Sequence, residues 1–415
     1  MLNKKTLLDI NCKDERVIVR VDFNVPIKDG KVVDPKRIVA AIPTIKHLLD
    51  NNCKVILLSH LSRIKTLDDI KSGKKSLKPV ADVLQQLLPN NQVIFLNFNR
   101  GRKLITAVEE LQHKQILLLE NTRYCDVNDA GEVVKLESKC DEQLGKEWAS
   151  LANIFVNDAF GTAHRKHASN VGIAKHIPTS CIGFLIQKEI ENLSKIVHNP
   201  QRPVVTILGG AKVSDKLKVI NNLLKIADKI LICGGMAYTF LKAQGVDIGS
   251  SLLETEMLDE AKNILAKGKD KIILPQDFYC APEFADVLPT IRTVTQGLNG
   301  VMGLDIGDQT LINFGSELVG AQTVFWNGPA GVFEFKNFQT GTRGICSILK
   351  KLTQHHHAFT LIGGGDSASA AVSLGFKESD FSFISTGGGA SLEFIEGATL
   401  PGIEAIQNKV TIHRK

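Results

Sequence analysis

Short runs of β-branched and apolar residues alternate with longer stretches of helical apolar spacing along nearly the whole chain. In the first half we expect strands at Arg16–Val25, Lys54–Leu58, Gln115–Leu119 and Ile154–Val156. In the second half we expect them at Val204–Leu208, Lys229–Ile232, Lys271–Leu274, Thr323–Trp326, Phe359–Ile362 and Phe381–Ile384. Helical spacing lies between them, as at Ser76–Leu88 and Asp215–Ile226. Strands separated by helices imply parallel sheets covered on both faces, so the predicted fold class is α/β.

The two halves differ in the residues that come directly after each strand. First-half strands lead into charged and amide residues, whereas second-half strands lead into glycines. A helical stretch at Gly183–His198, with the turn Asn199–Pro203 after it, divides the two patterns and can act as a hinge. We therefore expect an N-terminal domain at 1–182, a connecting helix at 183–199 and a C-terminal domain at 200–402.

Composition excludes several classes of protein. The 415 residues are 43% hydrophobic, too apolar for a disordered chain, yet no apolar run approaches the ~20 residues of a membrane span. The start, MLNKKTLLDI, lacks the features of a signal peptide. The eight cysteines form no CxxC pair, which favours reduced thiols in a cytoplasmic protein. A net charge of +6 is too mild to indicate nucleic acid binding.

Alternating residues from position 16 to 25 place Arg20, Asp22 and Asn24 on one face of one predicted strand. Asp22 and Asn24 stand at its carboxyl end, where open parallel sheets bind ligands. For Arg20, an edge strand with a solvated face is at least as good an interpretation. Arg37 comes after a turn and, taken alone, could be a surface residue.

In the first half, cationic side chains come after several of the predicted apolar strands. They are His60 and Arg63, then Arg123, then His164, Arg165 and His167. Several guanidinium groups together suit a small ligand that carries a phosphate and a carboxyl group. The alternative is a set of ion pairs with Asp22, Glu120 and Asp158.

Glycine-rich turns come after four second-half strands and open helices, whose N-termini favour anions. The turns are LGGAK at 208–212, CGGMA at 233–237, GGGDS at 363–367 and TGGGA at 386–390. Lys212 and Lys216 share one helical face and could reach two phosphates, or form an ordinary surface pair. Asp366 could hold Mg²⁺ beside nucleotide phosphates, or simply cap a helix. Glu334 could accept ribose hydroxyls or be a surface carboxylate.

Other nucleotide motifs are absent from the sequence or weak. There is no G-x-x-x-x-G-K-[ST], and the HRK at 164–166 is not the HRD of protein kinases. The stretch from Gly363 to Ala368 matches a relaxed dinucleotide fingerprint, but it stands late in the chain.

Several longer stretches together resemble the phosphoglycerate kinase family, in that family's order and over nearly the whole chain. They are RVDFNVP (20–26), SHLSR (59–63), ENTRY (120–124), VNDAFGTAHRKHAS (156–169), LGGAKVSDK (208–216), GGMAYTF (234–240), WNGPAGVFE (326–334), IGGGDSASA (362–370) and STGGGASLEFIEG (385–397). The resemblance implies reversible phosphoryl transfer from 1,3-bisphosphoglycerate to MgADP, giving 3-phosphoglycerate and MgATP. It also implies two Rossmann-like domains with the active site in the cleft between them, a C-terminal tail (about 403–415) that packs on the N-terminal domain, domain closure, and a monomer.

The resemblance implies a role for each matching residue. The phosphoglycerate would be held by Asp22, Phe23, Asn24, Arg37, His60, Leu61, Ser62, Arg63, Arg123 and Arg165. The nucleotide would be held by Gly210, Ala211, Lys212, Lys216, Gly234, Gly303, Leu304, Asn327, Pro329, Glu334, Gly364, Gly365, Asp366 and Ser367. Mg²⁺ would be bound by Asp366. The moving phosphoryl group would be surrounded by Arg37, Lys212, Gly364, Gly387 and Gly388.

The sequence departs from the family pattern at a few positions. Ser62 replaces the usual glycine of SHLGR, Ile64 replaces the proline after that motif, and Cys233 replaces the first glycine of GGGM. These changes bear on the shape of the loop at 60–64 and on the room beside the nucleotide. Two other functions remain open at this point: a nicotinamide-dependent dehydrogenase, and a binding protein that keeps the fold without turnover.

Overall fold

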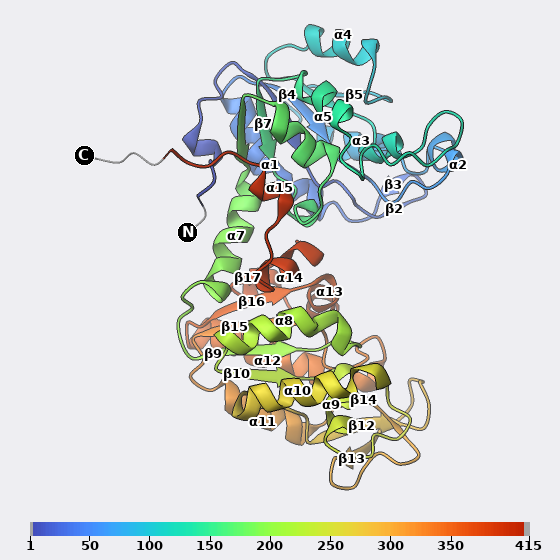
Figure 1. Cartoon of the computed structure of the whole chain (residues 1–415), viewed down its shortest axis with the longest axis vertical. Helices are drawn as coiled ribbons and strands as arrows, with labels where there is room; N and C mark the ends of the chain where they lie inside the picture. The colour runs from blue at the N-terminus through green and yellow to red at the C-terminus, as the bar shows by residue number, and fades with distance from the viewer. Residues whose placement is uncertain (1–2, 411–415) are drawn as a thin grey trace, which may run out of the picture. The chain divides into compact units, whose positions relative to one another are not determined.

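The computed structural model describes residues 3–410, which divide into two compact units (Figure 1). The first unit holds the chain up to Ile190 and from Thr399 onwards, and the second is Glu191–Ala398. The first boundary falls inside helix α7 (Phe184–Val197), which occupies most of the stretch for which we expected a connecting helix.

The first unit is built on a six-stranded sheet in the order β5-β6-β4-β1-β7-β8, with every neighbouring pair parallel. Its strands are β1 (Arg16–Arg20), β4 (Lys54–Leu58), β5 (Val93–Phe95), β6 (Ile116–Leu118), β7 (Ile154–Asn157) and β8 (Thr179–Ile182). A small hairpin adds β2 (Ile27–Lys28) and β3 (Lys31–Val32). The helices are α1 (Lys36–Asp50), α2 (Leu67–Lys71), α3 (Lys78–Leu87), α4 (Arg102–Glu110), α5 (Glu142–Ala149), α6 (Ile173–His176) and α15 (Pro401–Glu404).

The second unit repeats this architecture with a parallel sheet in the order β11-β10-β9-β15-β16-β17. Its strands are β9 (Val204–Leu208), β10 (Lys229–Ile232), β11 (Ile272–Ile273), β15 (Thr323–Asn327), β16 (Phe359–Gly363) and β17 (Phe383–Ile384). A separate antiparallel sheet joins β12 (Asp277–Ala281), β13 (Thr290–Thr293) and β14 (Met302–Ile306). The helices are α8 (Val213–Ile226), α9 (Met236–Ala243), α10 (Leu258–Gly268), α11 (Asp308–Leu318), α12 (Thr340–His355), α13 (Gly365–Ser373) and α14 (Gly389–Ile395). The prediction of an α/β fold with two Rossmann-like domains is confirmed.

Each of the predicted strands has a counterpart in the structure, and three of them have the predicted bounds: Lys54–Leu58, Val204–Leu208 and Lys229–Ile232. The strand predicted at Arg16–Val25 is too long, because β1 ends at Arg20. Beyond it, the Phe23 N–H donates to the Ser59 hydroxyl at 2.9 Å instead of to a neighbouring strand. Asp22 and Asn24 therefore lie on the loop after the strand and not on a strand face with Arg20.

The C-terminal segment packs on the first unit. The Gly402 N–H donates to the Ala163 carbonyl at 2.8 Å, and the Asn157 side chain donates to the Gly402 carbonyl at 3.0 Å. The Lys4 ammonium donates to the carbonyls of Glu404 and Ile406 at 2.7 and 2.8 Å. Residues 411–415 of the predicted tail lie outside the described residues.

Helix α7 starts against a buried carboxyl group. Asp158 comes directly after β7, is 0% exposed, and accepts a hydrogen bond from the Leu185 N–H at 2.9 Å, while its Oδ2 has no partner among the described residues. Burial raises the pKa of Asp158 from its ordinary 3.8 to about 7. The folded chain therefore carries this proton over a pH range in which the unfolded chain has lost it.

We expect this group to make the protein less stable as the pH rises from about 4 to about 7, because the folded state binds the additional proton throughout that window. Asp158→Asn should remove this part of the pH dependence, since the amide can still accept from Leu185. Urea unfolding of both proteins at pH 5 and pH 7.5 measures it. Equal pH slopes for the two proteins would contradict the assignment.

Candidate active site

Three of the predicted arginines line one pocket in the first unit. Arg63 comes after β4, Arg123 lies in the 3-10 helix after β6, and Arg165 comes after β7. The pocket has a volume of about 460 Å³, and its other lining residues include Lys65, Lys135 and Asp126. Three chain segments thus deliver cations to one place because the carboxyl ends of parallel strands share an edge. The excess of positive charge suits a doubly charged phosphate.

Arg123 is fixed in this pocket by its own surroundings. One terminal nitrogen of its guanidinium donates to the Ser62 carbonyl at 2.6 Å, and its backbone N–H donates to the Asn121 side chain at 3.1 Å. Burial lowers the pKa of Arg123, as do the neighbouring charges of Arg20 and Arg165. An anion that enters the pocket would offset this repulsion among the cations.

Arg37, in the first turn of α1, meets the loop after β1. Its guanidinium donates to the Asn24 carbonyl at 2.9 Å and to the Asp22 carboxylate at 3.4 Å. The Arg37 side chain remains 40% exposed, while that of Asp22 is 11% exposed. Gly161 lies so close that a Cβ there would stand 2.7 Å from the Asp22 carboxylate, so the VNDAFG turn packs directly on this group. Arg37 is positioned by one carboxylate and one carbonyl and still faces solvent.

The loop at 60–64 keeps a conformation that favours glycine although it contains serine. Ser62 has a φ of +57°, in the left-handed region, and its N–H donates to the Asn24 side chain at 2.8 Å. Ile64 is buried. The two departures from the family pattern are therefore accommodated, and the loop connects Asn24 to Arg123 through Ser62.

Two of the predicted substrate residues have side chains that are closed to a ligand. The side chains of Phe23 and Leu61 are buried in the core of the first unit. The N–H and C=O of Leu61 are both bonded to the side chain of Asn121, at 3.1 and 2.7 Å. Asn121 also accepts from the Arg123 N–H, so one buried amide orders both the loop and the arginine. The sequence did not predict this positioning role of Asn121. Its one signal there was the position of Asn121 in the ENTRY stretch at 120–124.

Arg20 is fully buried, contrary to the interpretation of an edge strand with a solvated face. The sheet order places β1 between β4 and β7, in the interior of the sheet. Its guanidinium contacts the side chains of His60 and Ser169 instead of water.

In the second unit, the ends of β9, β15 and β16 bring three predicted residues into contact. Asn327, at the end of β15, donates to the Gly363 carbonyl at 2.7 Å, and its other side-chain atom accepts from the Lys216 ammonium. A Cβ at Gly364, which has a φ of +96°, would stand 2.6 Å from the Asn327 amide. Lys216 and the start of α13 are therefore joined through one buried asparagine.

The two predicted lysines differ in environment. Lys212 is exposed and directly precedes α8, while Lys216 lies half-buried in the first turn of that helix. Burial lowers the pKa of Lys216. Lys212 is thus free to move toward a ligand, whereas Lys216 is held by Asn327.

The first turn of α13 presents an acidic group beside exposed backbone. Gly365 and Asp366 are exposed, and the buried Ser367 accepts from the Gly328 N–H at 2.6 Å. The Asp366 carboxylate forms no hydrogen bond or ion pair within residues 3–410. Across those residues, no three His, Cys, Asp or Glu side chains gather to hold a metal. The donor set fits a cation that takes one protein carboxylate and completes its shell with phosphate oxygens and water, as Mg²⁺ does.

The remaining predicted nucleotide residues form a layer of closely approaching backbone. A Cβ at the buried Gly234 would stand 2.6 Å from the Gly210 nitrogen and 2.9 Å from the Pro329 carbonyl oxygen. Gly303 packs against Tyr238, and the Leu304 carbonyl accepts from the Val332 N–H at 2.8 Å. Ala211 and Glu334 are exposed, and Gly387 and Gly388 precede α14. The thiol of Cys233 is sealed beside this layer at 0% exposure, so it is no target for modification there.

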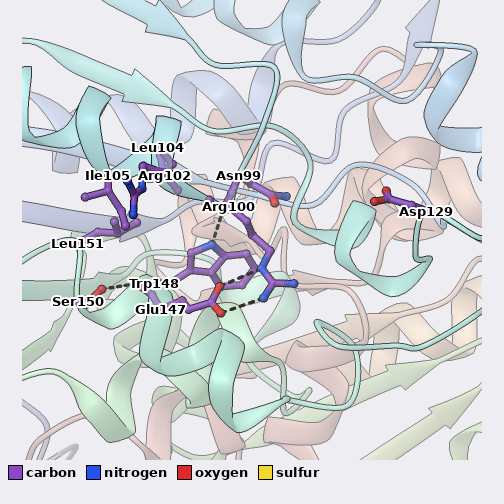
Figure 2. Close-up of a pocket in the computed structure, with 11 residues that line it drawn as sticks. Asn99, Arg100, Arg102, Leu104, Ile105, Asp129, Glu147, Trp148, Ser150 and Leu151 are labelled. Carbon is purple, nitrogen blue, oxygen red and sulfur yellow. Dashed lines mark hydrogen bonds and ion pairs between the residues drawn. The ribbon is translucent and has the colours of Figure 1, made fainter.

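A further pocket, of about 670 Å³, lies against α4 and α5 in the first unit, and none of the predicted site residues lines it (Figure 2). Arg100 forms two hydrogen bonds of 2.9 Å with the Glu147 carboxylate, and the Trp148 indole donates to the Asn99 carbonyl at 2.8 Å. Two arginines, Arg100 and Arg102, and two carboxylates, Glu147 and Asp129, line this pocket, so it lacks the excess of positive charge of the arginine pocket.

Two further observations concern the cysteines and the length of the helices. All eight cysteines lie in the described part of the chain and are free thiols. Within residues 3–410, no helix has both the length and the apolarity that a membrane crossing requires.

Comparison with known sequences gives one family. A family profile described as "Phosphoglycerate kinase" matches residues 7–398. The chain is 55% identical to the phosphoglycerate kinase of Spiroplasma citri over 99% of its own length and 100% of the relative's. It is 57% identical to that of Mycoplasmoides gallisepticum over 98% and 99% of the two chains.

Comparison with solved structures agrees. The structure of phosphoglycerate kinase from Coxiella burnetii superimposes with a TM-score of 0.85 at 35% identity, covering 97% of this chain and 98% of that one. The enzyme from Pyrococcus horikoshii gives a TM-score of 0.79 at 31% identity over 98% of both chains.

Proposed function

The chain belongs to the phosphoglycerate kinase family, and from this premise we propose how its own residues divide the work of the reaction. It is a phosphotransferase that exchanges a phosphoryl group between 1,3-bisphosphoglycerate and ADP, giving 3-phosphoglycerate and ATP. A dehydrogenase is not favoured by these comparisons.

The observation that carries the assignment of substrate residues is the arginine pocket. Arg63, Arg123 and Arg165 come from three distant segments and share one cavity. In our proposal they bind the phosphate at the far end of 3-phosphoglycerate. Arg37, held by Asp22 and Asn24, faces the other end, where the carboxyl group reacts. The phosphate of the substrate thus faces the three arginines of the pocket, and its carboxyl group faces Arg37.

The transfer itself requires little covalent chemistry from the protein. A carboxylate oxygen of 3-phosphoglycerate attacks the terminal phosphorus of ATP, and the bond from that phosphorus to the bridging oxygen breaks, leaving ADP. No strong base is needed because the carboxylate is already ionised. Catalysis then consists of positioning and of stabilising charge on the moving phosphoryl oxygens. We assign that task to Arg37, Lys212 and the backbone N–H groups of Gly364, Gly387 and Gly388.

The second unit supplies the nucleotide-binding groups in this proposal. Lys216 and Asn327 hold an inner phosphate, Glu334 accepts from the ribose, and the glycine layer around Gly210 and Gly234 lets the nucleotide approach the backbone. The family uses ATP or ADP with Mg²⁺, and the exposed Asp366 is the carboxylate that would bind the ion. Mg²⁺ would supply charge neutralisation of the phosphates when bound.

Each ligand is held by residues of one unit, so both must come within bonding distance for transfer. We propose that domain closure about helix α7 achieves this and excludes water during the reaction. We also propose that the protein acts as a cytoplasmic monomer. The eight free cysteines support a reducing compartment.

The proposal is tested by a coupled assay that measures 1,3-bisphosphoglycerate formation from 3-phosphoglycerate and MgATP. We expect turnover that depends on both substrates and on Mg²⁺, and no binding of NAD(H) in calorimetry. Absence of turnover by the purified full-length protein would overturn it.

Asp366→Asn should raise the Mg²⁺ concentration needed for half-maximal activity by about tenfold or more, because one charged ligand is lost. Asp308→Asn, which also changes an aspartate in the first turn of a helix of this unit, is the matched control. Activity titrated against free Mg²⁺ measures both. An unchanged Mg²⁺ requirement in the Asp366 variant would remove it from the metal site.

A further inference from the structure

Arg20 and His60 form a buried pair beneath the substrate residues of the first unit. Arg20 is 0% exposed at the end of β1, and His60, after β4, is 5% exposed. The Arg20 guanidinium donates from Nε to the Ser169 hydroxyl at 2.8 Å and from Nη1 to the Val21 carbonyl. Its remaining terminal nitrogen, Nη2, lies 3.1 Å from His60 Nδ1.

This contact fixes the position of the proton on the imidazole. A guanidinium has only donors and keeps its charge in proteins, so His60 Nδ1 has to be the acceptor. A ring whose Nδ1 accepts carries its proton on Nε2 and is neutral. The surroundings act in the same sense: burial above all, and then the neighbouring Arg20, Arg123, His167 and Arg37, hold the pKa of His60 well below the ordinary 6.5.

The other ring nitrogen is available to a ligand. His60 Nε2 has no hydrogen-bond partner within residues 3–410, and it is not one of the unpartnered polar atoms that are sealed from solvent there. It therefore accounts for part of the 5% of His60 that is exposed. The same loop continues into Ser62 and into Arg63, which lines the arginine pocket.

A buried carboxylate is linked to the arginine through Ser169. Glu137 is 0% exposed and accepts from the Ser169 N–H at 2.9 Å, while the Ser169 hydroxyl accepts from Arg20. Its charge favours the charged form of Arg20 and opposes the desolvation that burial imposes. Glu137, Ser169, Arg20 and His60 thus form one connected chain of buried groups.

We propose that Arg20 is a positioning residue that locks His60 in the neutral Nε2–H tautomer, so that the site offers the substrate a hydrogen-bond donor that does not change with pH. Glu137 is the counter-charge that keeps Arg20 in place. This inference rests on the proposed function for its ligand, a phosphate or carboxylate oxygen of phosphoglycerate. The tautomer itself can be read without turnover.

The first experiment is two-dimensional NMR of the full-length protein with ¹⁵N-labelled histidine, in which the His60 signals are assigned by their loss in His60→Gln. We expect His60 to show an unprotonated Nδ1 and a protonated Nε2 from pH 5.5 to pH 8. A protonated Nδ1, or an imidazolium at pH 7, would overturn the proposal. If the tautomer is as expected but the protein has no kinase activity, the proposed function fails and the tautomer stands.

The second experiment removes the lock while keeping the interior neutral. In the double variant Arg20→Met/Glu137→Gln, we expect His60 to titrate, and the KM for 3-phosphoglycerate to become pH-dependent and about tenfold higher at pH 8, with the KM for MgATP unchanged. Arg16→Met, at the other end of β1, is the control for loss of a strand arginine.

A pH-independent KM and an unchanged tautomer in the double variant would refute the role of Arg20. If that variant does not fold, the wild-type spectrum still decides.

Discussion

Replacing Arg37 with alanine is expected to lower kcat by about 10³-fold with a much smaller change in the KM for 3-phosphoglycerate. Its guanidinium is held by Asp22 and the Asn24 carbonyl, yet its side chain is 40% exposed, which leaves donors for the moving phosphoryl group. Those donors act where charge develops in the transition state, so their loss affects the chemical step. Steady-state kinetics in both directions measure the effect.

Arg123→Ala is the matched comparison, since it removes the same kind of side chain from the same unit. Arg123 lines the arginine pocket and is bonded to the Ser62 carbonyl, so its loss should raise the KM for 3-phosphoglycerate by about 10- to 100-fold and change kcat only a few-fold. Equal losses in both parameters for both variants would show that the two arginines do not divide binding and catalysis.

Lys212→Ala is expected to reduce kcat by about 10²–10³-fold, because it removes the exposed cation assigned to the transferring phosphoryl oxygens. The variant should fold normally, since the side chain contributes nothing to the core. Circular dichroism and the coupled assay together check this.

Lys218→Ala provides the control for Lys212. Lys218 is also an exposed lysine, and it lies on α8, the helix that Lys212 directly precedes. Removing Lys218 lowers the net charge of the second unit by one, as removing Lys212 does. The Lys218 variant should nevertheless keep kcat within twofold of wild type. A comparable loss in both variants would indicate a general electrostatic effect of the unit instead of a specific contact by Lys212.

The parallel strands were predictable because burial on both faces selects continuous β-branched runs, as at Val204–Leu208. The extent of β1 was not, because the alternation of apolar and polar residues continues to Val25 after the chain has left the sheet at Arg20. The antiparallel sheet of β12, β13 and β14 was also missed. The first two residues of β13 are exposed and the last two are half-buried. The strand therefore lacks the run or alternation of buried apolar residues by which a strand is recognised in a sequence.

That Arg63, Arg123 and Arg165 lie together could be predicted from the sequence because each comes after an apolar strand of a parallel sheet. Their supporting groups could not. Asn121 and Glu137 are polar residues that the sequence cannot distinguish from surface residues, although both are fully buried. The environment of Arg20 depended on the order of strands in the sheet, which residue patterns along one strand do not contain.

The division of the predicted site residues between the two units has a kinetic consequence. Every residue assigned to phosphoglycerate precedes Ile190, and every residue assigned to the nucleotide lies within Glu191–Ala398. Asn121 orders one set and Asn327 the other, each through contacts inside its own unit. Neither binding surface needs the other ligand to complete it. The two substrates should therefore add in random order, and the obligatory step should be the one taken once both are bound.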